Sequence, residues 1–164
     1  MVLDTKAFQT ADQQAFAALS LDWNPVHMDD VYARRTLFGQ AVVHGIHGLL
    51  WSLDSYLRHR NAPVQIAAMR ARFRRPLPVD STAQAVALEE RADGVQLSVE
   101  SGDQQVTQAD FTFAARELPP RPLAGAASAA CPDLSFDEAI ACRGSLPLVL
   151  DTAALQQLLP AVSR

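Results

Sequence analysis

The hydrophobic pattern of this chain changes its period once, near Asn61-Ala62-Pro63, and this change restricts the possible folds. Before it, apolar residues recur at helical spacing from Val42 to about His59, which predicts a long helix with one broad apolar face. After it, the period falls to two, and the pattern predicts strands at 64–75, 81–91, 95–101 and 104–115. A long helix followed by a sheet predicts an α+β fold.

The later strands alternate in a way that requires a core on one face only. Val95, Leu97 and Val99 alternate with polar residues, and a similar apolar row follows in the last strand. Asp93-Gly94 and Ser101-Gly102-Asp103 are turn sequences. The last three strands therefore form an antiparallel meander.

Shorter helices are expected on either side of this unit. Thr10 and Gln13 fit a capping box that opens an amphipathic helix over residues 11–20, and a weaker helix follows at 29–35. Near the other terminus we expect a short helix at 135–141 and another at 152–159, the latter with Asp151 as its N-cap.

Composition separates one folded domain, residues 1–117, from a Pro/Ala-rich linker and C-terminal extension, residues 118–164. A net charge of −4 argues against nucleic-acid binding. No apolar run approaches the ~18 residues of a membrane span, and the first residues do not form a signal peptide, so we expect a cytoplasmic protein. Cys131 and Cys142 lack zinc-site spacing and are expected to be free thiols.

A loop between the first two helices carries Asp22 and His27, five residues apart around Pro25. Proline stiffens the loop, and a carboxylate beside an imidazole can polarise a water molecule and exchange protons near neutral pH. The pair therefore predicts an acid/base site. The structural alternative is that Asp22 closes an Asx turn and His27 only caps the following helix.

The segments Phe16–His27 and Phe38–Ile46, with Ala33 between them, resemble the R-specific enoyl-CoA hydratases and MaoC-like dehydratases. The resemblance covers about residues 5–116. It implies a hot-dog fold, which is an antiparallel sheet wrapped around a long central helix, and a homodimer.

The resemblance also implies roles for individual residues. Asp22 and His27 hold one water molecule and add it to a 2-enoyl thioester, or remove it from a 3-hydroxyacyl thioester. Gly45 offers a backbone N–H group to the thioester oxygen, where negative charge develops. The alternative for Gly45 is a glycine that only starts a tightly packed helix. No cofactor is implied, because coenzyme A or the phosphopantetheine of an acyl carrier protein carries the acyl group.

The chain departs from the family pattern at three positions. Leu21 precedes the aspartate where many relatives have a small or acidic residue, His47 occupies the first turn of the long helix, and Leu53 replaces a hydroxyl residue of some relatives. These departures bear on chain length and on thioester preference. His44 and His47 are three residues apart but lack a further ligand, so we expect no metal.

Several further residues are candidates for substrate contact. Arg70, Arg72 and Arg74 alternate in one expected strand, where they form either a solvated face or a binding site for the phosphate of coenzyme A or phosphopantetheine. The full set of substrate-binding candidates is Asn24, Val43, His44, His47, Arg70, Arg72 and Arg74.

Two other functions remain open at this point. In a hot-dog thioesterase, the carboxylate directs water at the carbonyl carbon and releases a free thiol. In a non-catalytic hot-dog subunit, the same fold binds an acyl chain or a partner protein within a larger assembly.

Overall fold

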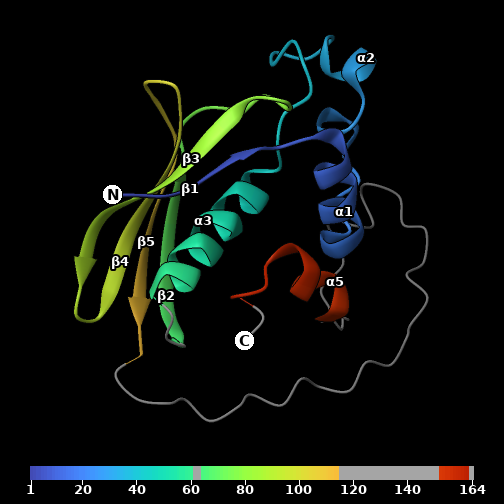
Figure 1. The fold of residues 1–164 in the computed structure, drawn as a ribbon. Coiled ribbons are helices and arrows are strands. Elements are labelled where there is room, and N and C mark those ends of the chain that lie inside the picture. Colours follow the sequence, from blue (N-terminus) through green and yellow to red (C-terminus); the bar gives the residue numbers. More distant parts are fainter. Residues whose placement is uncertain (61–63, 115–151, 163–164) are drawn as a thin grey trace, which may run out of the picture.

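A five-stranded antiparallel sheet covers one side of helix α3 (Gly45–Arg60), while α1 (Thr10–Ser20) and α5 (Thr152–Leu158) lie on the other side (Figure 1). This computed structural model describes residues 1–60, 64–114 and 152–162. The sheet has the order β1-β3-β4-β5-β2. Its strands are β1 (Val2–Ala7), β2 (Ile66–Phe73), β3 (Thr82–Arg91), β4 (Gly94–Ser101) and β5 (Gln104–Phe113).

Helix α3 is the central element of the core, as its apolar spacing predicted. Leu49, Leu53 and Tyr56 are at most 1% exposed and pack against the inner face of the sheet. The helix begins at Gly45 and not at Val42, because the backbone of Val42 and Val43 pairs with other segments of the chain. The N–H of Val42 donates to the Val26 carbonyl and that of Val43 to the Leu77 carbonyl, at 3.2 and 2.8 Å.

The predicted meander is confirmed, since β3, β4 and β5 pair in sequence order. The alternating row of Val95, Leu97 and Val99 is buried, as a strand with one face on the core requires. Strand β1 was not predicted. It is short and half-exposed at the sheet edge, and its polar residues hide the alternation that identifies a strand.

The start of α1 differs from the predicted capping box. Gln9 is the N-cap, and its N–H donates to the Asp12 carboxylate at 2.8 Å. Gln13, which we expected in the cap, is fully buried one turn further on. The weak helix expected at 29–35 is shorter, α2 (Asp30–Ala33), and follows the 3₁₀ helix η1 (Pro25–His27).

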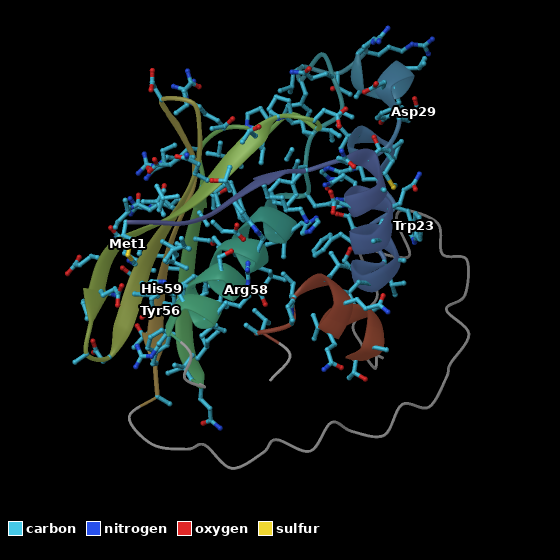
Figure 2. All side chains as sticks on the ribbon, in the orientation of Figure 1. Met1, Trp23, Asp29, Tyr56, Arg58 and His59 are labelled. Atoms are coloured by element: carbon cyan, nitrogen blue, oxygen red, sulfur yellow. The ribbon has the colours of Figure 1, made fainter. Side chains whose placement is uncertain are left out.

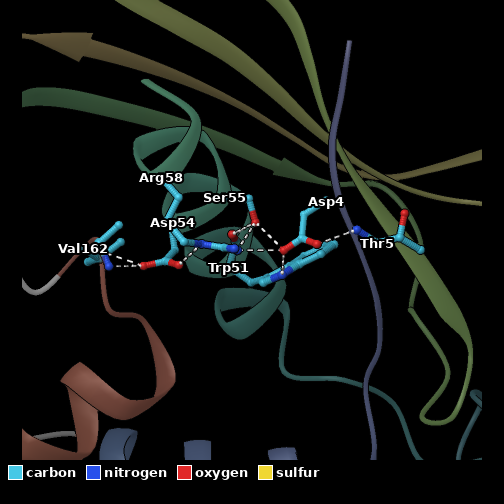
Figure 3. A network of polar contacts seen from close by, with 8 residues as sticks. Asp4, Thr5, Trp51, Asp54, Ser55, Arg58 and Val162 are labelled. Carbon is cyan, nitrogen blue, oxygen red and sulfur yellow. Dashed lines mark hydrogen bonds and ion pairs between the residues drawn. The ribbon is translucent and has the colours of Figure 1, made fainter. Parts of the chain in front are cut away.

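The C-terminal segment packs on the domain. Leu159 is fully buried in the same cluster as Phe8 and Trp51. Asp54, on α3, accepts hydrogen bonds from the N–H groups of Ala161 at 2.6 Å and Val162 at 3.0 Å, and Figure 3 shows this contact. The expected helix at 152–159 is therefore confirmed as α5.

Other predictions for this part of the chain fall outside the described residues. They are the linker, the helix at 135–141, the N-cap Asp151 and the two cysteines. Among the helices that the structure describes, none has the length and apolar character needed to cross a membrane.

Candidate active site

The loop between α1 and η1 is held by its own short-range hydrogen bonds. Leu21 ends α1 in the left-handed conformation, with φ of 61°. The Asn24 side chain accepts from the N–H of Val26 at 3.1 Å, and Asp22 Oδ1 accepts from the N–H of Asn24 at 3.3 Å. Pro25 occupies the first turn of η1, where its missing N–H costs nothing. Asn24, predicted to bind substrate, thus caps a 3₁₀ helix through its side chain.

His27 ends η1 with a defined ring orientation. Its Nδ1 lies 2.7 Å from the carbonyl oxygen of Val42. A carbonyl only accepts, so Nδ1 carries the proton in this contact and Nε2 of the neutral ring keeps its lone pair. The loop therefore fixes His27 in the tautomer that can accept a proton from water.

His44 connects three parts of the site. Its ring is 2% exposed, with Nδ1 3.0 Å from Gln13 Oε1 and Nε2 3.0 Å from the backbone carbonyl oxygen of Asp22. It also stacks on the ring of His27, with centroids 3.8 Å apart. Burial lowers the pKa of His44, whereas the hydrogen bond to Asp22 and the Asp22 carboxylate oppose this shift.

The side chains of Asp22, His27 and His44 converge. One ligand-type atom from each lies within 4.8 Å of the other two, and no other such group of His, Cys, Asp or Glu exists in the described part of the chain. These atoms could hold either a water molecule or a metal ion. Both nitrogens of His44 already face protein oxygens, so the geometry favours water between Asp22 and His27.

A cavity of about 340 Å³ opens beside this group. It lies between the start of α3, the end of β2 and the inner face of the sheet, and its wall is mostly apolar. Gly45 lines it at the first position of α3, where helix N–H groups have no partner within the helix. A Cβ atom on Gly45 would lie 3.0 Å from the ring of Phe73. The residues lining the cavity are His27, Phe38, Val42, Val43, His44, Gly45, Gly48, Phe73, Arg74, Arg75, Pro76, Leu77, Val99, Val106 and Thr107.

The structure separates the other predicted substrate-binding residues into two groups. Val43 and His44 line the cavity, whereas His47 does not and is 1% exposed. The His47 ring stacks on Phe16 and meets Phe8 edge-on. Burial and the nearby Lys6 lower the pKa of His47 to about 3.

The arginine row is also divided. Arg70 and Arg72 line a more polar hollow of about 500 Å³ formed by β2, β4 and β5, away from the Asp22 and His27 group. Arg74 lies beyond the end of β2 and lines the cavity with Arg75, because the period of two no longer applies after Phe73. The Arg74 guanidinium donates to Gln108 Oε1 at 2.8 Å.

Sequence reasoning did not identify three contributors to this site. Gln13 supplies the oxygen that faces His44, Phe73 lies over Gly45, and Arg75 lines the cavity mouth. The one available sequence signal for Gln13 was a polar glutamine on an otherwise apolar helix face. The places of Phe73 and Arg75 in the site depend on how β2 packs against α3, and the sequence pattern does not specify this packing.

Trp23 and several neighbouring apolar side chains remain exposed around the loop. Trp23 is 56% exposed, and Figure 2 shows it at the outer side of α1. Leu21 is 71% exposed. The departure from the family pattern at Leu21 therefore places an apolar side chain in solvent next to Asp22.

Comparisons with known proteins agree on one family. The MaoC like domain family matches residues 3–109. The chain is 46% identical over 59 residues to the (R)-specific enoyl-CoA hydratase of Aeromonas caviae, and this match covers 36% of the chain and 42% of the relative. It is 42% identical over 43 residues to the mitochondrial 3-hydroxyacyl-[acyl-carrier-protein] dehydratase of Arabidopsis thaliana, covering 26% of each. The chain thus spans less than half the length of the curated relatives it matches.

A solved structure extends the similarity to about two thirds of the chain. The (R)-hydratase from A. caviae involved in PHA biosynthesis superimposes with a TM-score of 0.56 and 28% sequence identity. The match covers 67% of this chain and 89% of that one.

Proposed function

The chain belongs to the MaoC-like domain family and has its hot-dog fold, and from this premise we propose that it hydrates 2-enoyl thioesters and dehydrates (R)-3-hydroxyacyl thioesters. The observation that carries the proposal is the convergence of Asp22 and His27 beside an apolar cavity whose wall includes Gly45. Similarity to a hydratase and a dehydratase supports the reaction type.

In the hydration direction, a water molecule lies between the Asp22 carboxylate and His27 Nε2. Asp22 accepts a proton as the water oxygen bonds to C3 of the enoyl group, and the proton returns through His27 to C2. Atoms and electrons balance, since one O–H bond and the C2=C3 π bond break while one C–O and one C–H bond form. Dehydration is the same path in reverse, so one pair of residues serves both directions.

The negative charge that develops on the thioester oxygen needs a preorganised donor. We assign this role to the N–H of Gly45, at the positive end of the α3 dipole. The absence of a Cβ lets the acyl group approach the backbone in a space that the Phe73 ring already narrows.

The rate of loss of enoyl-thioester ultraviolet absorbance tests the reaction. We expect turnover with an enoyl-CoA, loss of activity in His27→Ala, and no release of free thiol. Thiol release would instead support the thioesterase, and tight acyl binding without turnover over short and medium chains would support the non-catalytic subunit.

The same proposal includes a phosphate contact at the cavity mouth. Arg74 and Arg75 line the mouth, and guanidinium groups suit the phosphate of coenzyme A or of a carrier protein's phosphopantetheine. In Arg75→Gln we expect KM for the same acyl group to rise on either carrier. Arg91→Gln is the matched control, because Arg91 is ion-paired to Asp110 at 2.6 Å on the sheet. Equal KM values in Arg75→Gln and the wild type would remove the phosphate role.

We further propose a homodimer in which a second copy covers the edge strand β2. Strand β2 is the last strand in the sheet order and pairs only with β5 among the described strands. Ile66, Met69 and Phe73 on it are 42%, 52% and 51% exposed, which is unusual for apolar residues of a sheet beside a cavity. Sedimentation analysis tests this, and a monomer at micromolar concentration would contradict it.

A further inference from the structure

The His44 ring is in contact with both members of the catalytic pair. Its Nε2 lies 3.0 Å from the main-chain oxygen of Asp22, and its plane stacks at 25° on the ring of His27. It is 2% exposed, and both of its ring nitrogens and one face of the ring are in contact with protein groups. One buried side chain therefore sets the position of the Asp22 backbone relative to the His27 ring.

Gln13 fixes His44 from the opposite side. Its Oε1 lies 3.0 Å from the His44 backbone N and 3.0 Å from Nδ1 of the ring. Gln13 is fully buried on α1, and its Nε2 has no hydrogen-bond partner in the described part of the chain. Burying amide N–H donors without partners costs free energy. This cost indicates that the contact of Gln13 with His44 has a role other than packing.

The two oxygens around the ring decide where its protons lie. The Asp22 carbonyl can only accept, so Nε2 carries a proton in this contact. When His44 carries both protons, the Gln13 oxygen accepts from Nδ1 as well as from the His44 backbone N–H. The titratable groups that face this ring are the Asp22 carboxylate and His27.

We propose that His44 is a positioning residue that, held by Gln13, aligns Asp22 and His27 on their shared water through its Nε2–H and its stacked ring. This inference rests on the proposed function. It gives His44 a role other than the substrate contact predicted from sequence, because both ring nitrogens face protein oxygens. Displacement of a catalytic group by about 1 Å can cost about 100-fold in rate, so such a residue strongly affects kcat.

Two substitutions separate the two contacts of the ring. In His44→Gln, the side-chain NH₂ group can occupy the place of Nε2 and donate to the Asp22 carbonyl. In His44→Asn, the NH₂ group occupies the place of Nδ1 and can meet only Gln13. Both variants lose the stacked ring, so they form a matched pair that differs in the link to Asp22.

We expect kcat to fall about 100-fold in His44→Asn and by less than about 10-fold in His44→Gln, with KM within about threefold of wild type in both. Equal kcat in the two variants would overturn the proposal. So would a raised KM with unchanged kcat, because that pattern identifies a residue that binds substrate.

A measurement on the unmutated protein covers the case in which a variant does not fold. Long-range ¹H–¹⁵N spectra of the imidazole groups report which ring nitrogens are protonated. We expect Nε2 of His44 to be protonated between pH 6 and pH 8, and an unprotonated Nε2 there would overturn the proposal. If the wild-type protein did not hydrate any enoyl thioester while Nε2 was protonated, the proposed function would fail and the alignment of the loop would stand.

Discussion

Two carboxylates lie on or beside helix α3, and they are used in opposite ways. Asp54, in the C-terminal half of the helix, is 2% exposed and accepts hydrogen bonds from Arg58 and from two backbone N–H groups of the C-terminal segment (Figure 3). Asp22, beside the N-terminal end, is exposed and accepts one long hydrogen bond within the described residues, from Asn24.

This difference separates a structural carboxylate from a reactive one. The oxygens of Asp54 are occupied by fixed donors, so the group is committed to holding the C-terminal segment against α3. The oxygens of Asp22 have room for a water molecule, and the neighbouring imidazoles lie within 4.8 Å. Four substitutions, one in the loop after α1 and three on α3, test whether this contrast is real.

Asp22→Asn gives the largest expected effect. The substitution keeps the shape of the side chain but removes the base, so we expect kcat to fall about 1,000-fold. The free energy of unfolding should change by less than about 0.5 kcal/mol, because the side chain is exposed. Steady-state kinetics and urea unfolding of the same sample check both values. A large loss of stability would show that Asp22, like Asp54, is structural.

Asp54→Ala should have the opposite signature. It leaves the Nε–H of Arg58 and the N–H groups of Ala161 and Val162 without their Asp54 acceptor, and we expect a loss of about 3 kcal/mol in the free energy of unfolding. We also expect faster limited proteolysis of the C-terminal segment and an unchanged kcat per folded molecule. An unchanged proteolysis pattern would mean that the apolar packing of Leu159 and its neighbours holds the segment without Asp54.

His47→Leu tests the first turn of α3 through pH. In the unfolded chain an imidazole binds its proton near pH 6.5, but in the folded protein burial lowers the pKa of His47 to about 3. As pH falls below 6.5, the unfolded state takes up the proton first, so stability decreases down to about pH 3.

Because of His47, we expect the free energy of unfolding to be about 2 kcal/mol lower at pH 5 than at pH 8. The His47→Leu variant should not show this decrease. Urea unfolding at both pH values measures it. His47 also has a buried Nδ1 without a partner in the described chain, so the leucine variant should be no less stable at pH 8. An unchanged pH dependence would contradict the burial of His47.

Arg58→Lys has the smallest expected effect. Arg58 joins Asp54 at 2.9 Å to Asp4 at 2.7 Å, and its side chain is 47% exposed, so the loss of one contact should cost less than about 1 kcal/mol. Burial alone would raise the pKa of Asp4, but hydrogen bonds from Arg58 and the N–H of Thr5 hold it below its ordinary value. An NMR titration should therefore show a higher Asp4 pKa in the variant. An unchanged Asp4 pKa in the variant would show that donors other than Arg58 lower it.

The elements with strong periodicity were predicted well. The long helix and the four strands after it were confirmed with boundaries that moved by a few residues, because buried rows such as Val95, Leu97 and Val99 follow directly from the strand period. Strand β1 was missed, since a half-exposed edge strand has no clear alternation. The Asp22 and His27 loop was found because proline and the two polar groups lie close together in sequence.

The sequence by itself determined helix α3 and the four strands after it, and it located the Asp22 and His27 loop, because these features depend on residues near one another along the chain. Only the tertiary structure decided that Gln13 faces His44, that Asp54 holds the C-terminal segment, and that the arginine row divides between two hollows. Gln13 and His44 are 31 residues apart, and Asp54 and Ala161 are 107 apart. Such contacts arise from the packing of α1, α3 and α5, and residue spacing carries no signal for them.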